Sequence, residues 1–418
     1  VFYGWWLTGV AALILVMGTV PIFQGMPAWF VVLEREFSWS RTQLSLAFSL
    51  TRVEGTVMGP VAGYLVDKLG ARRMVQIGLP VMGVGFLLFS QVHNLWQFYG
   101  AFVVMSMGAG LGTWLPMMTA LNHWFQARRS IAMSLAMEGF AVGGILLVPA
   151  LVWAIDPEQP DRLGWRLTAA IIGLAVIVLA FPVSQLVRNR PEDYGEVPDG
   201  RAARARLERS TEAGAPRVQG PEYTWQEALR TRSFWVITIG HACSSVVIVT
   251  LTVHLGPMLT DRGFSLPTVG WVVATYTGVG AIFTLIGGYI GDRVPIRWAL
   301  FGFSVIQSAA VVVILFAETA AAVYLFAVVF GIGFGGRTPL TSAIRGVYFG
   351  RRAFASITGV SMIPMNIMML VFPLFAGIMF DLKGNYNIPF GALAVVSFFG
   401  AALFLLLKEP QPQALDHV

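Results

Sequence analysis

The sequence predicts an all-α membrane protein with twelve transmembrane helices in two pseudo-symmetric six-helix halves. Three observations lead to this prediction. The 418-residue chain is 56% hydrophobic and only 12% charged, whereas about a quarter of a soluble domain is charged. It contains twelve apolar stretches of the roughly 20 residues that a spanning helix needs. Its second half also partly repeats its first.

The predicted spans follow one another through short connections, with one exception after the sixth span. In chain order they cover 5–32, 42–65, 74–91, 97–121, 131–153, 167–186, 234–255, 268–290, 298–316, 321–343, 354–379 and 388–407. The exception is a polar stretch rich in Arg, Glu, Pro and Gly, a composition that predicts a mobile linker. The end of this stretch, 223–230, is expected to form a short amphipathic helix on the membrane surface.

These spans predict four parts of the chain. They are an N-terminal six-helix bundle (1–187), a cytoplasmic linker (188–232), a C-terminal six-helix bundle (233–407) and a cytoplasmic tail (408–418). With the N-terminus in the cytoplasm, 20 of the 28 lysines and arginines fall in inner segments, Arg345 among them, and 6 in outer segments. Because cytoplasmic loops are enriched in these residues, we expect both termini inside. The net charge of +6 is then a topological signal and requires no nucleic acid partner.

The internal repeat appears when the second half of the sequence is laid over the first. Gly63–Lys68 then falls over Gly288–Arg293, and Arg128-Arg129 falls over Arg351-Arg352. Gly108, Gly110, Gly112 and Pro116 fall over Gly331, Gly333, Gly335 and Pro339. Two six-helix halves related in this way are typical of transporters whose binding site lies between the halves, near the midplane.

The loop between spans 2 and 3 carries the most specific motif. It reads Gly63-x-x-x-Asp67-Lys68-x-Gly70-Ala-Arg72-Arg73, and it resembles the signature loop of the major facilitator superfamily. We expect Asp67 to lie against a helix N-terminus, where the helix dipole favours a carboxylate. The resemblance implies a conformational-gating role for the named residues, with Asp292 and Arg293 in the equivalent places of the second half.

Within that superfamily, the chain resembles the monocarboxylate-porter group and its bacterial relatives, which include oxalate/formate-type exchangers. The segments that carry the resemblance are Tyr3–Trp6, Glu36–Arg41, Asn122–Arg129, Ala136–Gly143, Gly164–Arg166 and Arg190–Gly195. The resemblance implies transport of small organic anions, often coupled to a proton.

The chain departs from this group at its best-known charged positions. The mammalian members carry a lysine near the outer end of span 1, where this chain has Val31-Val32. They also carry Asp and Arg in span 8, which fall near Gly280 and Thr284 here. Span 11 lacks the lysine that oxalate exchangers use. The resemblance therefore does not identify the anion.

Four ionisable residues fall well inside predicted spans: Arg52 and Glu54 in span 2, Glu138 in span 5 and Arg337 in span 10. Such a charge costs at least ~2.5–3.5 kcal/mol, so it should be paired, face a cavity or be functional. Arg52 and Glu54 are two residues apart and cannot face each other on a helix. Structural ion pairs with other helices are one interpretation for Arg52, Glu54 and Glu138.

Arg337 is the predicted anion-binding residue. In the repeat it takes the place of Trp114, in a span that lines the central cavity of this superfamily. Its planar guanidinium suits a carboxylate, although a structural role is the alternative. Further candidates for the substrate site are Arg52, Trp114, Tyr276, Gln24 and Asn366.

A proton-coupled carrier also needs a group that changes protonation. Glu54 or Glu138 could serve, because a carboxylate in a low-dielectric cavity holds its proton more tightly. His241 could serve because histidine titrates near neutral pH, and its alternative is a packing role. We predict no metal or other cofactor, since the single cysteine excludes a thiolate cluster.

We therefore predict a monomeric secondary transporter of small organic anions in a bacterial inner membrane, and not an enzyme. The expected mechanism is proton symport by alternating access. An organic-anion exchanger is the first alternative. A proton-driven drug exporter is disfavoured because span 5 lacks the Gly-Pro pair usual in such carriers. The glycine-rich segment 331–336 lies in an apolar span without a preceding strand, which excludes a nucleotide-binding loop.

Overall fold

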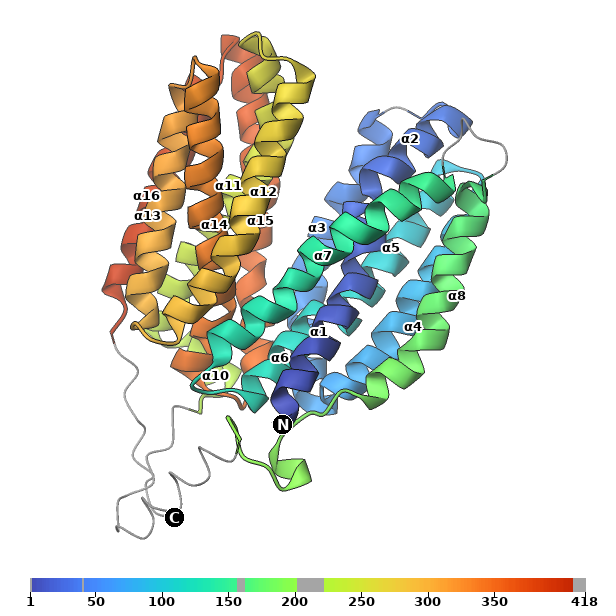
Figure 1. Ribbon diagram of the computed structural model, residues 1–418, viewed down its shortest axis with the longest axis vertical. Coiled ribbons are helices and arrows are strands. Elements are labelled where there is room, and N and C mark those ends of the chain that lie inside the picture. The colour runs from blue at the N-terminus through green and yellow to red at the C-terminus, as the bar shows by residue number, and fades with distance from the viewer. Residues whose placement is uncertain (1, 40, 156–161, 201–221, 409–418) are drawn as a thin grey trace. The chain divides into compact units, whose positions relative to one another are not determined.

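The computed structural model describes residues 2–39, 41–155, 162–200 and 222–408, and within these ranges it contains helices and no strands. The middle of the predicted linker and the predicted C-terminal tail after Lys408 lie outside the described residues. Figure 1 shows the helices coloured along the chain.

The chain forms two compact units. Unit 1 comprises residues 1–126, 135–217 and 353–360, and unit 2 comprises residues 127–134, 218–352 and 361–418. The short segments 127–134 and 353–360 thus group differently from their neighbours in the sequence. The predicted division of the chain into the consecutive parts 1–187, 188–232, 233–407 and 408–418 therefore stays a prediction.

In the first half of the chain, the described residues form eight helical segments of 11 residues or more, which Figure 1 labels. They are α1 (Tyr3–Thr19), α2 (Met26–Phe37), α3 (Arg41–Leu69), α4 (Ala71–Ser90), α5 (Leu95–Gly112), α6 (Trp114–Trp124), α7 (Arg129–Ile155) and α8 (Gly164–Gln185). A π-helical turn, η1 (Val20–Gln24), joins α1 to α2, and a 3-10 turn, η2 (Glu192–Tyr194), follows α8. Within unit 1, α4 packs along both α5 and α8.

In the second half, the described residues form one short helix and six long ones. They are α10 (Trp225–Leu229), α11 (Arg232–Asp261), α12 (Leu266–Gly291), α13 (Ile296–Leu315), α14 (Ala320–Phe349), α15 (Phe354–Lys383) and α16 (Asn387–Leu403), which ends in a 3-10 turn, η3 (Phe404–Leu406). The short helix α10 falls inside the segment 223–230 where a helix was predicted. Within unit 2, α14 packs along both α12 and α13.

The helices account for the twelve predicted spans. Among the described residues, eleven helical stretches are long and apolar enough to cross a membrane. The remaining predicted span, 42–65, corresponds to α3, whose middle carries Arg52 and Glu54 among several serines and threonines. These polar side chains lower the mean hydropathy of α3, and for this reason α3 is not among the eleven apolar stretches.

The first predicted span is broken in its C-terminal half. At η1 the N–H of Gly25 donates to the carbonyl of Val20, five residues back, over 2.8 Å. The displaced carbonyl of Pro21 instead accepts from the indole N–H of Trp29 at 2.9 Å. A π-turn of this kind frequently marks a functional position in a helix. Here it carries Gln24 toward α7, where Gln24 Nε2 donates to the carbonyl of Phe140 at 2.9 Å.

Close helix contacts at glycines set the register of the internal repeat. A Cβ atom on Gly108 of α5 would lie 2.2 Å from the backbone N of Met82 on α4. A Cβ atom on Gly333 of α14 would lie 2.3 Å from the backbone N of Gln307 on α13. The shift along the sequence that carries Met82 onto Gln307 also carries Gly108 onto Gly333. The predicted pairing of Gly108 with Gly331 is therefore wrong by two residues.

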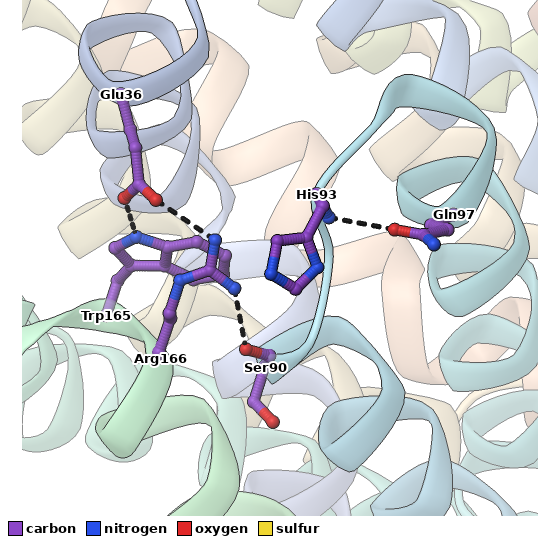
Figure 2. A network of polar contacts seen from close by, with 6 residues as sticks. All are labelled: Glu36, Ser90, His93, Gln97, Trp165 and Arg166. Atoms are coloured by element: carbon purple, nitrogen blue, oxygen red, sulfur yellow. Dashed lines mark hydrogen bonds and ion pairs between the residues drawn. The ribbon is translucent and has the colours of Figure 1, made fainter.

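A polar and aromatic network joins two of the segments on which the family resemblance rests (Figure 2). The carboxylate of Glu36, at the end of α2, accepts from the indole N–H of Trp165. It also pairs with Arg166, with 3.1 Å between Nη2 and Oε1. Arg166 Nη1 donates to the carbonyl of Ser90 at 3.0 Å, so the ends of α2, α4 and α8 are held together in unit 1.

The described ends of the linker bind equivalent turns of the repeat. In unit 1 the N–H of Asp199 donates to the carbonyl of Trp124 at 3.0 Å, and its carboxylate accepts from the N–H of Gln126 at 3.1 Å. In unit 2 the N–H of Tyr223 donates to the carbonyl of Phe349 at 3.0 Å. The shift fixed by the glycine contacts carries Trp124 onto Phe349, so the two attachments follow the repeat.

Candidate functional site

Arg337 lies in the middle of α14, inside unit 2, with 3% of its surface exposed. Its Nε donates to Oε1 of Gln307 on α13, and its Nη2 donates to the carbonyl of Ser244 on α11 at 3.0 Å. Gln307 Nε2 donates to the same carbonyl at 2.8 Å. The guanidinium thus joins three helices of one unit through uncharged partners.

The direction of Arg337 follows from the corrected register. With Gly108 laid over Gly333, Arg337 stands where Gly112 stands in the first half, and not where Trp114 stands. Gly112 is a point of close contact with α4, where a Cβ would lie 2.8 Å from the backbone N of Leu79. Arg337 correspondingly faces α13, the counterpart of α4. Its predicted role in anion binding remains untested by these contacts.

Arg345 is a second buried arginine, which the sequence analysis placed in a cytoplasmic loop. That placement is wrong, because α14 continues to Phe349 and leaves only 2% of Arg345 exposed. Its Nε donates to Ser361 Oγ on α15 at 2.9 Å, and its Nη1 donates to the carbonyl of Thr341 at 2.5 Å. Its Nη2 bonds to Nδ1 of His241 on α11 at 2.9 Å.

A guanidinium can only donate hydrogen bonds, so His241 must accept this one. Nδ1 of His241 therefore carries the lone pair, and the neutral ring holds its proton on Nε2. Electrostatic interactions with His241 come from Arg345 and Arg337, both on α14. The structure thus brings the predicted residues Arg337 and His241 together in one cluster, with Arg345 as an added member.

This cluster carries two buried cations without a carboxylate. Among the described residues of unit 2, neither Arg337 nor Arg345 forms an ion pair. A guanidinium has five N–H donors, and the hydrogen bonds of this part of the chain occupy two on Arg337 and three on Arg345. An unpaired charge buried in a membrane is costly. The cluster is therefore suited to receive an anion.

Three predicted ionisable residues lie in unit 1. Glu54 on α3 accepts a hydrogen bond from Ser106 Oγ on α5 at 3.1 Å. Arg52 lies half-buried on the same helix, and Glu138 lies half-buried on α7. The carboxylate of Glu138 forms no hydrogen bond with the other described residues of unit 1, so it is the least constrained of the predicted proton carriers.

The predicted uncharged site residues fall in different places. Trp114, at the start of α6, packs against an apolar cluster of unit 1, and Tyr276 packs edge-on against Phe330 in unit 2, with 5.3 Å between ring centroids. Gln24 lies beside α7, as described above. Asn366 is buried on α15, the helix that also carries Ser361.

Two aspartates of the repeat bind helix N-termini in the same way. In unit 1, Asp67 accepts hydrogen bonds from the backbone N–H groups of Ala355 and Ser356, at 3.2 and 2.7 Å. In unit 2, Asp292 accepts from Ser130 and Ile131, at 2.8 and 3.0 Å. Acceptors and donors again correspond under the shift fixed by the glycine contacts. The expected contact of Asp67 with a helix N-terminus is present, and its gating role stays a prediction.

Burial raises the pKa of the Asp292 carboxyl, while the hydrogen bonds from Ile131 and Ser130 and the positive charge of Arg129 act in the opposite direction. The carboxylate is thus partly removed from water, and hydrogen bonds from N–H groups at the start of α7 replace part of its lost hydration. Such N–H groups have no partner inside the helix and favour a nearby negative charge.

The two glycines of the signature loop, Gly63 and Gly70, are each required for a different steric reason. A Cβ atom on Gly63 would lie 2.4 Å from the carbonyl oxygen of Ala355, so only glycine allows this approach. Gly70 precedes α4 with φ 84° and ψ 157°, a conformation that other residues avoid. A side chain there would also collide with Asn189, whose Oδ1 accepts from the N–H of Arg72 at 2.9 Å.

The basic residues of the motif lie toward the surface. Lys68, Arg73 and Arg293 are exposed, whereas Arg72 is half-buried. Lys68 lies 5.6 Å from the ring centroid of Tyr64, and the guanidinium of Arg293 lies 3.5 Å from that of Tyr289. Exposed cations at the ends of spans suit contact with anionic lipid headgroups.

Sequence reasoning missed Arg345 and Gln307. Arg337, Thr341 and Arg345 follow one another at intervals of four residues, which places a polar stripe along one helix. This spacing could have extended the tenth span beyond residue 343. Gln307 was equally visible as a polar residue in the middle of an otherwise apolar ninth span. Among the described residues, no group of three or more His, Cys, Asp or Glu side chains is arranged so that it could bind a metal ion.

The sequence matches the Major Facilitator Superfamily over residues 2–266 and 253–417. The chain belongs to the Major Facilitator Superfamily. The predicted family is thereby confirmed, as is the all-α membrane fold. Members of this superfamily are multi-pass membrane transporters, so this facilitator is a transporter and not an enzyme.

Three curated relatives show which facilitators are similar to this one. Monocarboxylate transporter 11 of Mus musculus is 22% identical over 98% of this chain and 88% of its own length. The hexuronate transporter of Escherichia coli strain K12 is 25% identical over 91% of this chain and 88% of its own length. The oxalate:formate antiporter of Oxalobacter formigenes is 24% identical over 47% of this chain and 42% of its own length.

Proposed function

We propose that this facilitator transports small organic anions of the monocarboxylate type, coupled to protons, by alternating access. The observation that carries the proposal is the pair of arginines inside α14, whose partners among the described residues are all uncharged. The names of the relatives support it, since monocarboxylates, hexuronates, oxalate and formate are all carboxylates.

The anion would bind on α14. Arg337 and Arg345 are eight residues apart, ~12 Å along the helix axis. Each keeps N–H donors that a carboxylate can accept in the planar arrangement of a guanidinium. In this proposal Arg337 is the predicted anion ligand, with Arg52 as a second predicted cation, and Trp114, Tyr276, Gln24 and Asn366 are predicted to contact the substrate.

The proton would be carried by a side chain that can bind and release a proton and that lies near the anion-binding site. Glu54, Glu138 and His241 are the three candidates. His241 has the strongest support, because its ring is hydrogen-bonded to a member of the cation cluster. A residue that senses the charge of the anion couples the two ligands directly.

The membrane setting of the proposal follows from charge distribution. Both termini would face the cytoplasm of a bacterial cell, and the protein would act as a monomer in the inner membrane. The signature loop with Gly63, Asp67, Lys68, Gly70, Arg72 and Arg73, together with Asp292 and Arg293, would control the conformational change.

Uptake by proteoliposomes tests the proposal. Labelled formate, pyruvate, oxalate and glucuronate are offered to the reconstituted protein, with an acidic exterior and then without a pH gradient. We expect at least one carboxylate to enter faster with the acidic exterior, and a protonophore to remove the difference. Absence of uptake of all four carboxylates would contradict the proposal.

An anion exchanger is the second candidate, favoured by the similarity to the oxalate:formate antiporter. The same vesicles distinguish the two. If exchange operates, unlabelled carboxylate inside the vesicles accelerates uptake at equal pH. If symport operates, the acidic exterior drives accumulation without internal substrate.

A further inference from the structure

The hydrogen bond between Arg345 and His241 has a consequence for charge. While Arg345 Nη2 donates to His241 Nδ1 at 2.9 Å, the imidazole cannot take a proton on that nitrogen. Protonation requires the guanidinium to release Nδ1 first. Arg345 can do so without becoming detached, because Ser361 Oγ and the carbonyl of Thr341 hold the same group through two other hydrogen bonds.

Among the residues that the structure describes, the charged groups that act on His241 are two arginines, Arg345 and Arg337. Among the described residues, the other Asp, Glu, Lys and Arg side chains on α11 and on the helices that pack against it lie at or near helix ends: Glu227, Arg232, Asp261, Arg297, Asp381 and Lys383. A protonated His241 would thus be a third cation in the cluster, which low dielectric strongly disfavours.

We propose that Arg345 and His241 form one anion–proton site, in which a carboxylate and a proton bind together in equal number. The carboxylate binds the guanidinium of Arg345, which lets go of Nδ1. Nδ1 then takes a proton from the aqueous phase to which the site is open, and the imidazolium donates to the carboxylate. The site gains one negative and one positive charge, so its net charge is unchanged.

This inference rests on the proposed function and makes it more specific. It selects His241 over Glu54 and Glu138 as the proton carrier, and it selects Arg345 as the group that links the proton to the anion. It also predicts the substrate class, a carboxylate that binds as the anion. In this inference Arg345 replaces Arg337 as the residue that binds the anion. Arg337, held by Gln307 and the carbonyl of Ser244, contributes positive charge and a fixed position for α14.

Calorimetry on the full-length protein in detergent tests the inference. The binding of formate, pyruvate, oxalate and glucuronate is measured at pH 6 to 8 in two buffers of different ionisation enthalpy, which yields the number of protons taken up per anion. For the wild type we expect about one proton per bound carboxylate near neutral pH. The decisive variant is His241→Gln, whose amide oxygen can accept from Arg345 but cannot be protonated. It should still bind the carboxylate and take up no proton.

Two further variants complete the design. His254→Asn is the matched control, because His254 is a buried histidine on the same helix, hydrogen-bonded to the carbonyl of Pro373 at 2.9 Å, and we expect its proton uptake to equal that of the wild type. Arg345→Lys keeps the charge but loses the planar fork, so carboxylate affinity should fall ~10–100-fold.

The outcomes separate the inference from the proposed function. If the wild type binds none of the four carboxylates and transports none, the proposed function fails and this site fails with it. If a carboxylate binds without proton uptake, or if His241→Gln takes up as many protons as the wild type, only the anion–proton site is overturned. Loss of proton uptake in His241→Gln with retained binding supports it.

Discussion

Arg337 and Arg345 lie two turns apart on α14 but are held differently. The partners of Arg337 are an amide oxygen on α13 and a backbone carbonyl on α11, and Gln307 itself completes the triangle by donating to that carbonyl. Arg345 instead bonds to a histidine that can change its own charge. The first arrangement fixes three helices in place, whereas the second can respond to a ligand.

The triangle around Arg337 makes a prediction about stability. Gln307→Leu should lower the free energy of unfolding by about 1–3 kcal/mol, because it leaves a buried guanidinium N–H and the carbonyl of Ser244 without this partner. Thermal unfolding of the purified protein measures the change. In a double-mutant cycle with Arg337→Met, the double variant should lose less stability than the sum of the single variants. Additive losses would contradict the direct contact between the two side chains.

At the scale of elements, the long helices meet at positions where only glycine fits. Gly108 and Gly333 bring α5 against α4 and α14 against α13 at the same place of the repeat. The shift that relates these two glycines also relates the contacts of Asp67 and Asp292. Since close backbone approach is what small residues provide in membrane helices, these contacts set the helix register.

The glycine contacts predict a contrast between neighbouring residues of α5. Gly108→Ala should destabilise the protein, because its Cβ would lie 2.2 Å from the backbone N of Met82, which cannot move away cheaply. Gly110→Ala, two residues further on, should be neutral or slightly stabilising, since nothing lies within 4 Å of its Cβ.

Thermal unfolding of both variants measures this contrast. We expect Gly108→Ala to cost about 1–3 kcal/mol, the range for overpacking in a tightly packed core. Gly333→Ala should behave like Gly108→Ala, because its Cβ would lie 2.3 Å from the backbone N of Gln307. Equal melting temperatures for Gly108→Ala and Gly110→Ala would show that α4 and α5 do not approach as closely as described.

At the scale of the whole molecule, the number of spans and the family could be predicted because they depend on composition, spacing and repetition. The C-terminal end of α14 could not be predicted in this way. In a sequence, an arginine at the end of an apolar stretch is indistinguishable from a loop residue. Arg345 is buried among side chains of other helices, among them His241 of α11 and Ser361 of α15. A register based on matching glycines likewise slipped by two residues, since Gly331, Gly333 and Gly335 are equally spaced.

The basic residues at span ends predict the orientation of the molecule in the membrane. Arg73 and Arg293 are expected on the cytoplasmic side and Lys383 on the outer side, and all three side chains are exposed. A cysteine introduced at Lys383 should react with a membrane-impermeant maleimide in intact bacterial cells. Cysteines at Arg73 or Arg293 should react only after the membrane is opened, because the reagent cannot cross it.

The native Cys243 is buried, with 3% of its surface exposed, and should add little background in folded protein. Labelling of the Arg73 and Arg293 positions in intact cells, with Lys383 protected, would reverse the orientation and with it the direction of the proton gradient that drives uptake.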